Sequence, residues 1–334
     1  MITICHSGEG RDPSFKSLDS GVRRNDEVRA RVQRRAVHGV LLLDKPLGLS
    51  SNDALQKAKR LLRAEKAGHT GTLDPLATGL LPICFGAATK FSQASLEADK
   101  AYRASLALGT TTSTADGEGS VLRERPVAVT RAQVEAACRG FVGTIEQLPP
   151  MHSALKHEGR ALYDYARAGV EVERTPRRVM IRRIDIVEWQ ERRLVIDVVC
   201  SKGTYIRTLA EDIGEALGCG AHLAALRRTA SGALSVDRAV SLEALAAMSE
   251  AERDAQLLPV DALLAEAPEI RLDEADAGRF LTGLRRRVDA ADSAPLRVYG
   301  PQPRAFLGSA HITGGELIAD RLLSPMEVQA LLAS

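Results

Sequence analysis

The sequence has few of the residues that typically mark a metal site, a disulfide scaffold or a membrane span. Its five cysteines include no C-x-x-C pair and are odd in number. That usage argues against a zinc site or a disulfide framework and fits a reducing cytosol. The longest apolar runs are far too short to cross a bilayer, and the N-terminus lacks the continuous apolar stretch of a secretory signal. We therefore expect a cytoplasmic protein without a membrane anchor.

Excess charge and cofactor motifs are also missing. The 45 Lys and Arg residues nearly balance the 43 Asp and Glu residues, which leaves a net charge of +2. A nucleic-acid partner would therefore need basic residues gathered on one face. No G-x-x-x-x-G-K-[ST] loop for phosphate and no G-x-S-x-G nucleophile turn occurs. We expect neither a metal nor a cofactor. Aromatic residues make up only 4% of the chain, so each tyrosine carries more information than usual.

The chain of 334 residues is 45% hydrophobic, which is ample for a core and favours two domains. Residues 1–36 are polar and lack hydrophobic periodicity, so we expect a disordered leader. Strand and helix patterns alternate over 37–258. Composition changes near Pro259, and 259–334 contain short β-type segments punctuated by Gly and Pro, typical of a small β barrel or sandwich. The class is α+β, with a mixed, mostly antiparallel sheet flanked by helices and a small β-rich second domain.

The helix expected after the first strand has one strongly basic face. Ser51 or Asn52 is placed to cap it and Gly68 to end it. A charged face is usually a solvated face, but five cations with few acids also fit contact with phosphates. Those cations are Lys57, Lys59, Arg60, Arg63 and Lys66.

The stretch 68–82, GHTGTLDPLATGLLP, places one carboxylate, Asp74, between a glycine-rich loop and an apolar run. Asp at the N-cap followed by Pro75 at the first helical position is a normal helix start. An acid held out toward a substrate as a nucleophile is the other interpretation. The local residues leave both open.

A longer comparison favours the second interpretation. The run from Gly39 through Gln93 closely resembles the opening of the TruB family of pseudouridine synthases. The similarity continues in order through DKAYRASLALGTTTSTADGEG, PPMHSALKHEGRALYDYARAG and CSKGTYIRTLAEDIGEALGCGAHLAALRR, so that it covers about residues 38–240. It implies a pseudouridine synthase fold with a PUA-like RNA-binding domain at 259–334. It also implies isomerisation of uridine 55 in the T arm of tRNA without a cofactor.

The resemblance assigns three catalytic residues. Asp74 matches the catalytic aspartate, and Arg207 matches the arginine that pairs with it. Tyr102 matches a tyrosine that stacks on the flipped uracil and serves the proton on carbon 5. Without the resemblance, Arg207 reads as one half of a helical i, i+4 pair with Glu211, and Tyr102 as a half-buried strand residue.

Five further residues match substrate-binding positions of the family. Tyr205 and Leu226 match the pocket wall, and core packing explains Leu226 equally well. His69 matches a loop histidine that fills the space left by the flipped base. Lys45 matches a motif lining the active site, although a strand-ending turn explains it almost as well. Lys90 is expected at the RNA backbone, with a strand-edge lysine as the alternative.

Other functions remain to be weighed against this one. A synthase of the same fold acting on another RNA would need protein partners, and this chain lacks the long basic extension common in such relatives. An RNA chaperone that folds tRNA would not need Asp74, Tyr102 and Arg207 together. A hydrolase would need a second general base near Asp74. We therefore expect a monomer that acts on tRNA without an obligate protein partner. The chemical course stays open between attack at ring carbon 6, attack at the sugar carbon and elimination at the sugar.

Overall fold

The structure is a computed structural model that describes residues 33–153, 155–301 and 304–333. The predicted leader, 1–36, therefore lies outside the described residues except for its last four positions. Of these, Arg35 forms a backbone bridge with Ala64, and its guanidinium donates to the Asp254 carboxylate.

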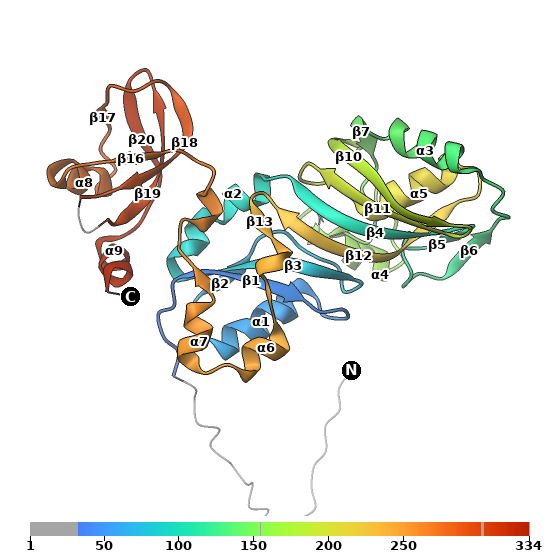
Figure 1. Cartoon of the computed structure of the whole chain (residues 1–334), viewed down its shortest axis with the longest axis horizontal. Helices are drawn as coiled ribbons and strands as arrows, with labels where there is room; N and C mark the ends of the chain where they lie inside the picture. The colour runs from blue at the N-terminus through green and yellow to red at the C-terminus, as the bar shows by residue number, and fades with distance from the viewer. Residues whose placement is uncertain (1–32, 154, 302–303, 334) are drawn as a thin grey trace, which may run out of the picture. The chain divides into compact units, whose positions relative to one another are not determined.

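Within the described residues, eleven strands form one mixed sheet (Figure 1). Its central order is β14-β1-β3-β12-β4-β11-β10-β7. Strands β3 and β12 pair in parallel, as do β1 and β14, and the other pairs are antiparallel. The prediction of a mixed, mostly antiparallel sheet is confirmed. The strands are β1 (Gly39–Lys45), β2 (Ala67–His69), β3 (Ala77–Phe85), β4 (Lys100–Leu108), β7 (Gly143–Gln147), β10 (Arg177–Gln190), β11 (Arg193–Cys200), β12 (Ala221–Ser231), β13 (Leu234–Ser235), β14 (Val240–Ser241) and β15 (Leu257–Leu258).

Two groups of helices cover different parts of this sheet. Helices α1 and α6 pack at the β1–β3 end, and α5 packs with α3 against β12, β4, β11 and β10 (Figure 1). Each group encloses its own hydrophobic cluster. The helices of this region are α1 (Ser51–Leu61), η1 (Gly86–Phe91), α2 (Ser92–Glu97), α3 (Arg131–Gly140), α4 (Leu162–Arg167), α5 (Ile206–Ala216), η2 (Val236–Arg238), α6 (Leu242–Ala247), α7 (Glu250–Ala255) and η3 (Ala262–Leu264).

The C-terminal residues form a second, five-stranded sheet in the order β16-β18-β19-β20-β17. Its core adjoins the first sheet, because Phe91 from η1 packs against Phe306 at a centroid distance of 5.1 Å. The elements are β16 (Glu269–Arg271), α8 (Glu274–Leu281), β17 (Arg286–Arg287), β18 (Ser293–Tyr299), β19 (Phe306–Thr313), β20 (Glu316–Leu322) and α9 (Pro325–Leu332). Two small hairpins complete the described elements, β5 (Thr110–Thr112) with β6 (Val121–Glu124) and β8 (Lys156–His157) with β9 (Arg160–Ala161).

The sequence prediction was wrong about the two ends of α1. Ser50, and not Ser51 or Asn52, is the N-cap and accepts a hydrogen bond from the Asp53 amide. Helix α1 ends at Leu61 rather than near Gly68, because the chain turns there and continues as β2 along β3.

The helix expected after Asp74 is absent from the structure, and Ala77–Phe85 is strand β3 instead. This strand is buried on both faces between β1 and β12, and tertiary burial of a continuous apolar run outweighs a local capping signal. Gly79 allows the close approach of β12, because its φ is +97° and a Cβ there would lie 2.3 Å from the Arg228 carbonyl oxygen. The carboxylate of Asp74 is thus free of a capping role.

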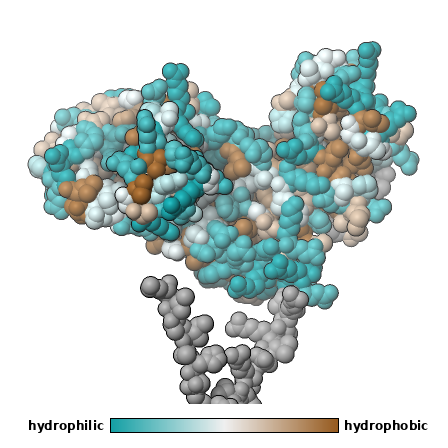
Figure 2. All heavy atoms as spheres, turned by 180° about the vertical axis from the view of Figure 1, so that it is seen from behind, coloured by the Kyte–Doolittle hydropathy of each residue, from teal (hydrophilic) through white to brown (hydrophobic). Residues whose placement is uncertain are grey.

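Among the residues that the structure describes, no helix is both long and apolar enough to span a bilayer. The surface where α1, α6 and α7 lie is strongly hydrophilic (Figure 2). Of the five basic residues predicted on one helix, Lys57, Lys59 and Arg60 lie on α1, whereas Arg63 and Lys66 follow its end, and Arg63 is bound to Glu250. The other four form no ion pair with any residue in the described ranges. A contact of this face with phosphates stays a prediction.

Candidate active site

Asp74 and Arg207, which are far apart in the sequence, form an ion pair. Asp74 lies in the turn before β3, and Arg207 lies in the first turn of α5. Nη2 of Arg207 is 3.0 Å from Oδ2 of Asp74 and donates to the His152 carbonyl oxygen at 2.6 Å. The Arg207 side chain is 7% exposed, whereas that of Asp74 is 44% exposed. The arginine is therefore fixed inside the protein while the carboxylate faces an open space.

A second carboxylate holds the other side of the arginine. Oδ2 of Asp116 lies 3.5 Å from Nη1 of Arg207, and its side chain is only 4% exposed. Its other oxygen accepts hydrogen bonds from the Thr114 hydroxyl and the Glu118 amide. Sequence reasoning missed this residue. The signal that was present is an acid in the Thr/Ser/Gly loop 110–119, and the structure shows that Asp116 is buried there.

The ionisation of Asp74 reflects opposing influences. Burial raises the pKa of Asp74 above its ordinary value, and the charge of Arg207 lowers it. The Asp116 charge raises the pKa further, and the Lys45 charge lowers it. The net direction is upward, so the carboxylate is a stronger base than an exposed aspartate. The positive charge of Arg207 opposes that increase.

A cavity of about 430 Å³ opens beside the pair. It is lined by five of the predicted site residues, namely Asp74, Tyr102, Tyr205, Arg207 and Leu226. Tyr102 on β4 and Leu226 on β12 contribute the wall formed by the sheet.

The wall at the start of α5 is held by a side-chain clamp on Tyr205. The buried Gln147 amide accepts from the Tyr205 backbone N–H at 3.0 Å and donates to its carbonyl oxygen at 3.2 Å. This clamp fixes the residue that precedes Ile206 and Arg207, and so sets where α5 begins. The pairing of Arg207 with Glu211, the alternative drawn from the sequence, does not occur among the ion pairs of the described residues.

Three predicted residues do not line this cavity. His69 is the last residue of β2 and half-buried, and its Nδ1 is buried without a hydrogen-bond partner in the described structure. Lys45 is fully buried and donates to the carbonyls of Pro46 and Leu49. Burial lowers the pKa of Lys45 to about 8, and the charge of nearby Asp74 opposes that shift. Lys45 therefore ties the turn after β1, and its charge lowers the pKa of Asp74.

The geometry gives Lys90 a different role from the one expected at the RNA backbone. Its ammonium donates to the Glu327 carboxylate at 2.6 Å and to the Leu322 carbonyl oxygen at 2.9 Å. These contacts fasten η1 to the C-terminal sheet and to α9. An ammonium already paired in this way is poorly placed to bind a phosphate.

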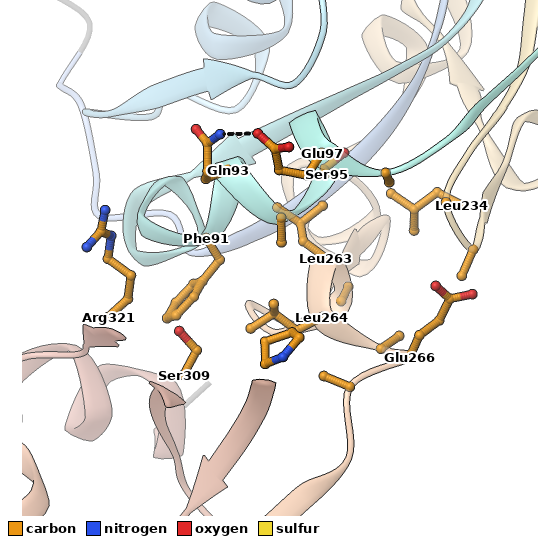
Figure 3. Close-up of a pocket in the computed structure, with 18 of the residues that line it drawn as sticks. Phe91, Gln93, Ser95, Glu97, Leu234, Leu263, Leu264, Glu266, Ser309 and Arg321 are labelled. Carbon is orange, nitrogen blue, oxygen red and sulfur yellow. Dashed lines mark hydrogen bonds between the residues drawn. The ribbon is translucent and has the colours of Figure 1, made fainter. Parts of the chain in front are cut away.

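A larger cavity, of about 810 Å³, lies elsewhere and lacks paired reactive groups. Figure 3 shows Phe91, Leu263 and Leu264 pointing into it. The Gln93 and Glu97 side chains at its edge bond to each other, as the dashed line marks (Figure 3). The smaller cavity is the one that holds the Asp74–Arg207 pair together with Tyr102. In the described part of the chain, no cluster of three or more His, Cys, Asp or Glu residues is placed to hold a metal ion.

The three-residue network predicts opposite shifts in the pH dependence of activity. Activity that needs ionised Asp74 is lost as the pH falls through its pKa. Replacing Arg207 by Gln removes a charge that lowers this pKa, so the acid limb of the rate profile should move to higher pH. Asp116→Asn removes a charge that raises it, so the limb should move to lower pH. Both changes should lower the plateau rate by about 10²-fold, because the carboxylate loses its fixed orientation.

Single-turnover rates measured from acid to neutral pH test this prediction. Glu211→Gln is the matched control, since Glu211 lies four residues along the same helix without binding Arg207. If the acid limb of the rate profile moved in the same direction in Arg207→Gln and in Asp116→Asn, the result would contradict the network.

Comparison with known proteins identifies the family of the chain. Three family models match the chain in sequence: "TruB family pseudouridylate synthase (N terminal domain)" over residues 59–206, "tRNA pseudouridylate synthase B C-terminal domain" over 207–265, and "Pseudouridine synthase II TruB, C-terminal" over 268–323. The chain is 58% identical to tRNA pseudouridine synthase B of Verminephrobacter eiseniae, over 92% of this chain and 95% of that protein. It is 60% identical to the protein of the same name from Ralstonia nicotianae, over 88% and 96% of the two chains.

Solved structures show the same fold at lower identity. A chain of a Cbf5-Nop10-Gar1 complex superposes with a TM-score of 0.67 at 24% identity, covering 89% of this chain and 87% of that chain. A chain of the archaeal box H/ACA sRNP Nop10-Cbf5 complex gives a TM-score of 0.65, with 88% of each chain covered. The expected pseudouridine synthase fold is confirmed. With matching family models along most of its length and relatives near 60% identity, the chain belongs to the TruB family of pseudouridine synthases.

Proposed function

We propose that this protein converts uridine 55 in the T arm of tRNA to pseudouridine. The observation that carries the proposal is the 3.0 Å pair between Asp74 and Arg207 at the mouth of a cavity that also holds Tyr102 and Leu226. The relatives near 60% identity bear the name tRNA pseudouridine synthase B, which supports tRNA as the substrate. We expect the reaction to take place in the cytoplasm.

The cavity suits one nucleoside rather than a stretch of helical RNA. Its volume of about 430 Å³ is near the lower end of the range for small-ligand sites. A base inside folded RNA has no access to such a space, so the target nucleotide has to be flipped out of its stack. Tyr102 offers a ring for stacking, and Leu226 an apolar contact on the same wall.

The chemistry is a rearrangement within one nucleotide. Asp74 supplies the carboxylate that acts at the ring or the sugar, and Arg207 keeps it charged and oriented. Tyr102 faces the ring, and its hydroxyl takes part in removing the proton from carbon 5. The uracil leaves its sugar through N1, turns, and rejoins through carbon 5, so no electrons are gained or lost overall.

RNA binding would rest on local positive surfaces, since the net charge is only +2. The basic face of α1 would contact the phosphate backbone, and the C-terminal sheet would bind the acceptor side of the tRNA. We propose that a single chain performs the reaction without a protein partner. Binding by such surfaces should weaken as salt is raised.

A direct assay tests the proposal. The protein is incubated with unmodified tRNA, and pseudouridine is mapped along the product, with a tRNA carrying cytidine at position 55 as the matched control. We expect pseudouridine at position 55 alone. Conversion at other positions with none at 55 would point to another RNA target, and no conversion of any RNA would reject the enzyme assignment.

His69 provides a prediction about binding. It ends β2 on the loop before Asp74, outside the cavity lining. We expect His69→Ala to raise KM for tRNA about tenfold and to change the single-turnover rate at saturating RNA little, because the side chain fills space beside the flipped base and touches no reacting atom. Steady-state and single-turnover measurements separate the two effects. A fall in the saturated rate with unchanged KM would contradict this role.

A further inference from the structure

Arg228 is a buried cation that the reaction described above does not use. Its side chain is 1% exposed and is the largest of the fully buried side chains in the described structure. Its Nε donates to the Leu80 carbonyl oxygen at 2.7 Å, and its Nη2 donates to the Gly71 carbonyl oxygen at 3.1 Å. None of the ion pairs among the described residues includes it. A desolvated guanidinium held only by carbonyl dipoles is energetically costly, so its position calls for a function.

Arg228 is among the residues that line the catalytic cavity. On β12 this residue lies directly opposite Tyr102 of β4, and cross-strand partners point to the same face of a sheet. Leu226, two residues earlier, shares that face and also lines the cavity. The neighbouring Arg227 alternates to the other face, where it binds both carboxylate oxygens of Asp44.

The positive charge of Arg228 reaches several groups around the cavity. It lowers the pKa values of His69, Lys45 and Lys100, where burial is the larger cause in each case. Its charge also lowers the pKa of the Tyr102 phenol against the stronger raising effect of burial. The carboxylate of Asp74 in the same cavity is paired with Arg207. The sheet wall therefore presents a positive charge without a permanent counter-ion.

We propose that Arg228 stabilises the negative charge that the uracil ring carries while it is detached from the sugar. This inference rests on the proposed function. When the C1′–N1 bond breaks, the electron pair stays on N1 and spreads over the ring carbonyls. The sugar carbon bonds to the Asp74 carboxylate or loses a proton from C2′.

The later steps balance the charge again. A bond forms between C5 and C1′ while the bond from C1′ to the Asp74 carboxylate breaks or, after elimination, C2′ regains its proton. The proton on C5 then leaves to a base, and N1 takes up a proton. If Asp74 instead attacks ring carbon 6, electrons are likewise pushed onto a ring oxygen. In each course, the uracil ring carries the most negative charge after the C1′–N1 bond has broken and before the C5–C1′ bond has formed. A fixed cation in a site shielded from water stabilises that stage more than the neutral starting uridine, and so speeds the reaction.

The test compares uridine with 5-fluorouridine at the target position of a T-arm RNA. Fluorine withdraws electrons and makes the detached ring a more stable anion, so a missing positive charge matters less. We measure single-turnover loss of the target nucleoside in Arg228→Gln, which keeps a donor but no charge, and in Arg228→Lys, which keeps the charge. Arg227→Gln is the matched control on the opposite face of the same strand.

We expect Arg228→Gln to slow uridine conversion by about 10²-fold with little change in KM, and its deficit to shrink to about tenfold or less with 5-fluorouridine. Arg228→Lys should stay within about tenfold of the unaltered protein on both RNAs. The control Arg227→Gln should convert both RNAs at the rates of the unaltered protein. Equal losses of Arg228→Gln on both RNAs would mean that Arg228 only supports the fold, and would overturn the proposal.

Two further outcomes remain informative. If Arg228→Gln does not fold, as circular dichroism would show, the lysine variant decides. A large uridine-specific loss despite its retained charge would reject the proposal. If the unaltered protein converts neither RNA, the proposed function itself fails, and this result differs from any pattern produced by Arg228 alone.

Discussion

Replacing Asp74 by Asn should abolish pseudouridine formation and leave the fold and tRNA binding intact. An amide of nearly the same size has no charge with which to attack, so we expect the single-turnover rate to fall by at least about 10⁴-fold. The fold should tolerate the change, because the Asp74 side chain is 44% exposed and caps no helix. Arg207 keeps Asp116 and the His152 carbonyl as partners. Its guanidinium is thus not left without a counter-charge.

The measurement needs three readouts on one protein preparation. Pseudouridine is mapped in tRNA after long incubation, binding is measured by filter retention, and thermal unfolding is followed by circular dichroism. Asp197→Asn is the matched control, since Asp197 forms an exposed pair with Arg103 away from the cavity. We expect that control to retain full activity. Turnover in Asp74→Asn would reject Asp74 as the nucleophile, whereas loss of folding in it would show a structural role that the exposed side chain does not suggest.

Most of the helices and strands that carry this site could be predicted from the sequence, but the way they bring the site residues together could not. Strands and helices such as β4, β11 and α5 are readable because their apolar spacing and closing glycines agree with their final environment. Asp74 and Arg207 were brought together only by the family resemblance, since local spacing favours a helix cap for one and a helical ion pair for the other. Their meeting depends on the pairing order of β3, β12 and β4, which no short window of sequence encodes.

The errors have the same physical origin. The segment after Asp74 carries a helix-start signal, yet burial between two strands makes it β3. Lys90 is expected at the RNA backbone, yet Glu327, 237 residues away, pairs with its ammonium. The sequence did not single out Asp116 and Arg228, because what distinguishes them from other charged residues is that they are buried. A charged residue in a sequence is assumed to be solvated, and only the fold shows which charges are not.

Replacing Tyr102 by Phe should separate the two tasks assigned to this tyrosine. The ring that stacks on the flipped uracil is retained, so tRNA binding should stay close to that of the unaltered protein. The hydroxyl that serves the proton on carbon 5 is lost, so release of that proton should slow by about 10²- to 10⁴-fold. The variant should therefore accept the uridine, turn its ring, and stall before the final proton leaves. Tyr163→Phe on α4, outside the cavity, is the matched control.

Uridine labelled with tritium at carbon 5 reports the final step, and nucleoside chromatography of digested RNA reports the disappearance of uridine. A stalled variant loses uridine without releasing tritium at the normal rate. Normal tritium release would remove the proton role and leave only stacking, which Tyr102→Leu would then test through weaker RNA binding, by about 1–3 kcal/mol. Burial raises the pKa of this phenol above its ordinary value and the charge of Arg228 opposes that rise, so the hydroxyl is protonated at neutral pH. The proton role thus depends on the same positive wall that we propose for the detached ring, and Tyr102→Phe together with Arg228→Gln should slow conversion by less than the product of their separate effects.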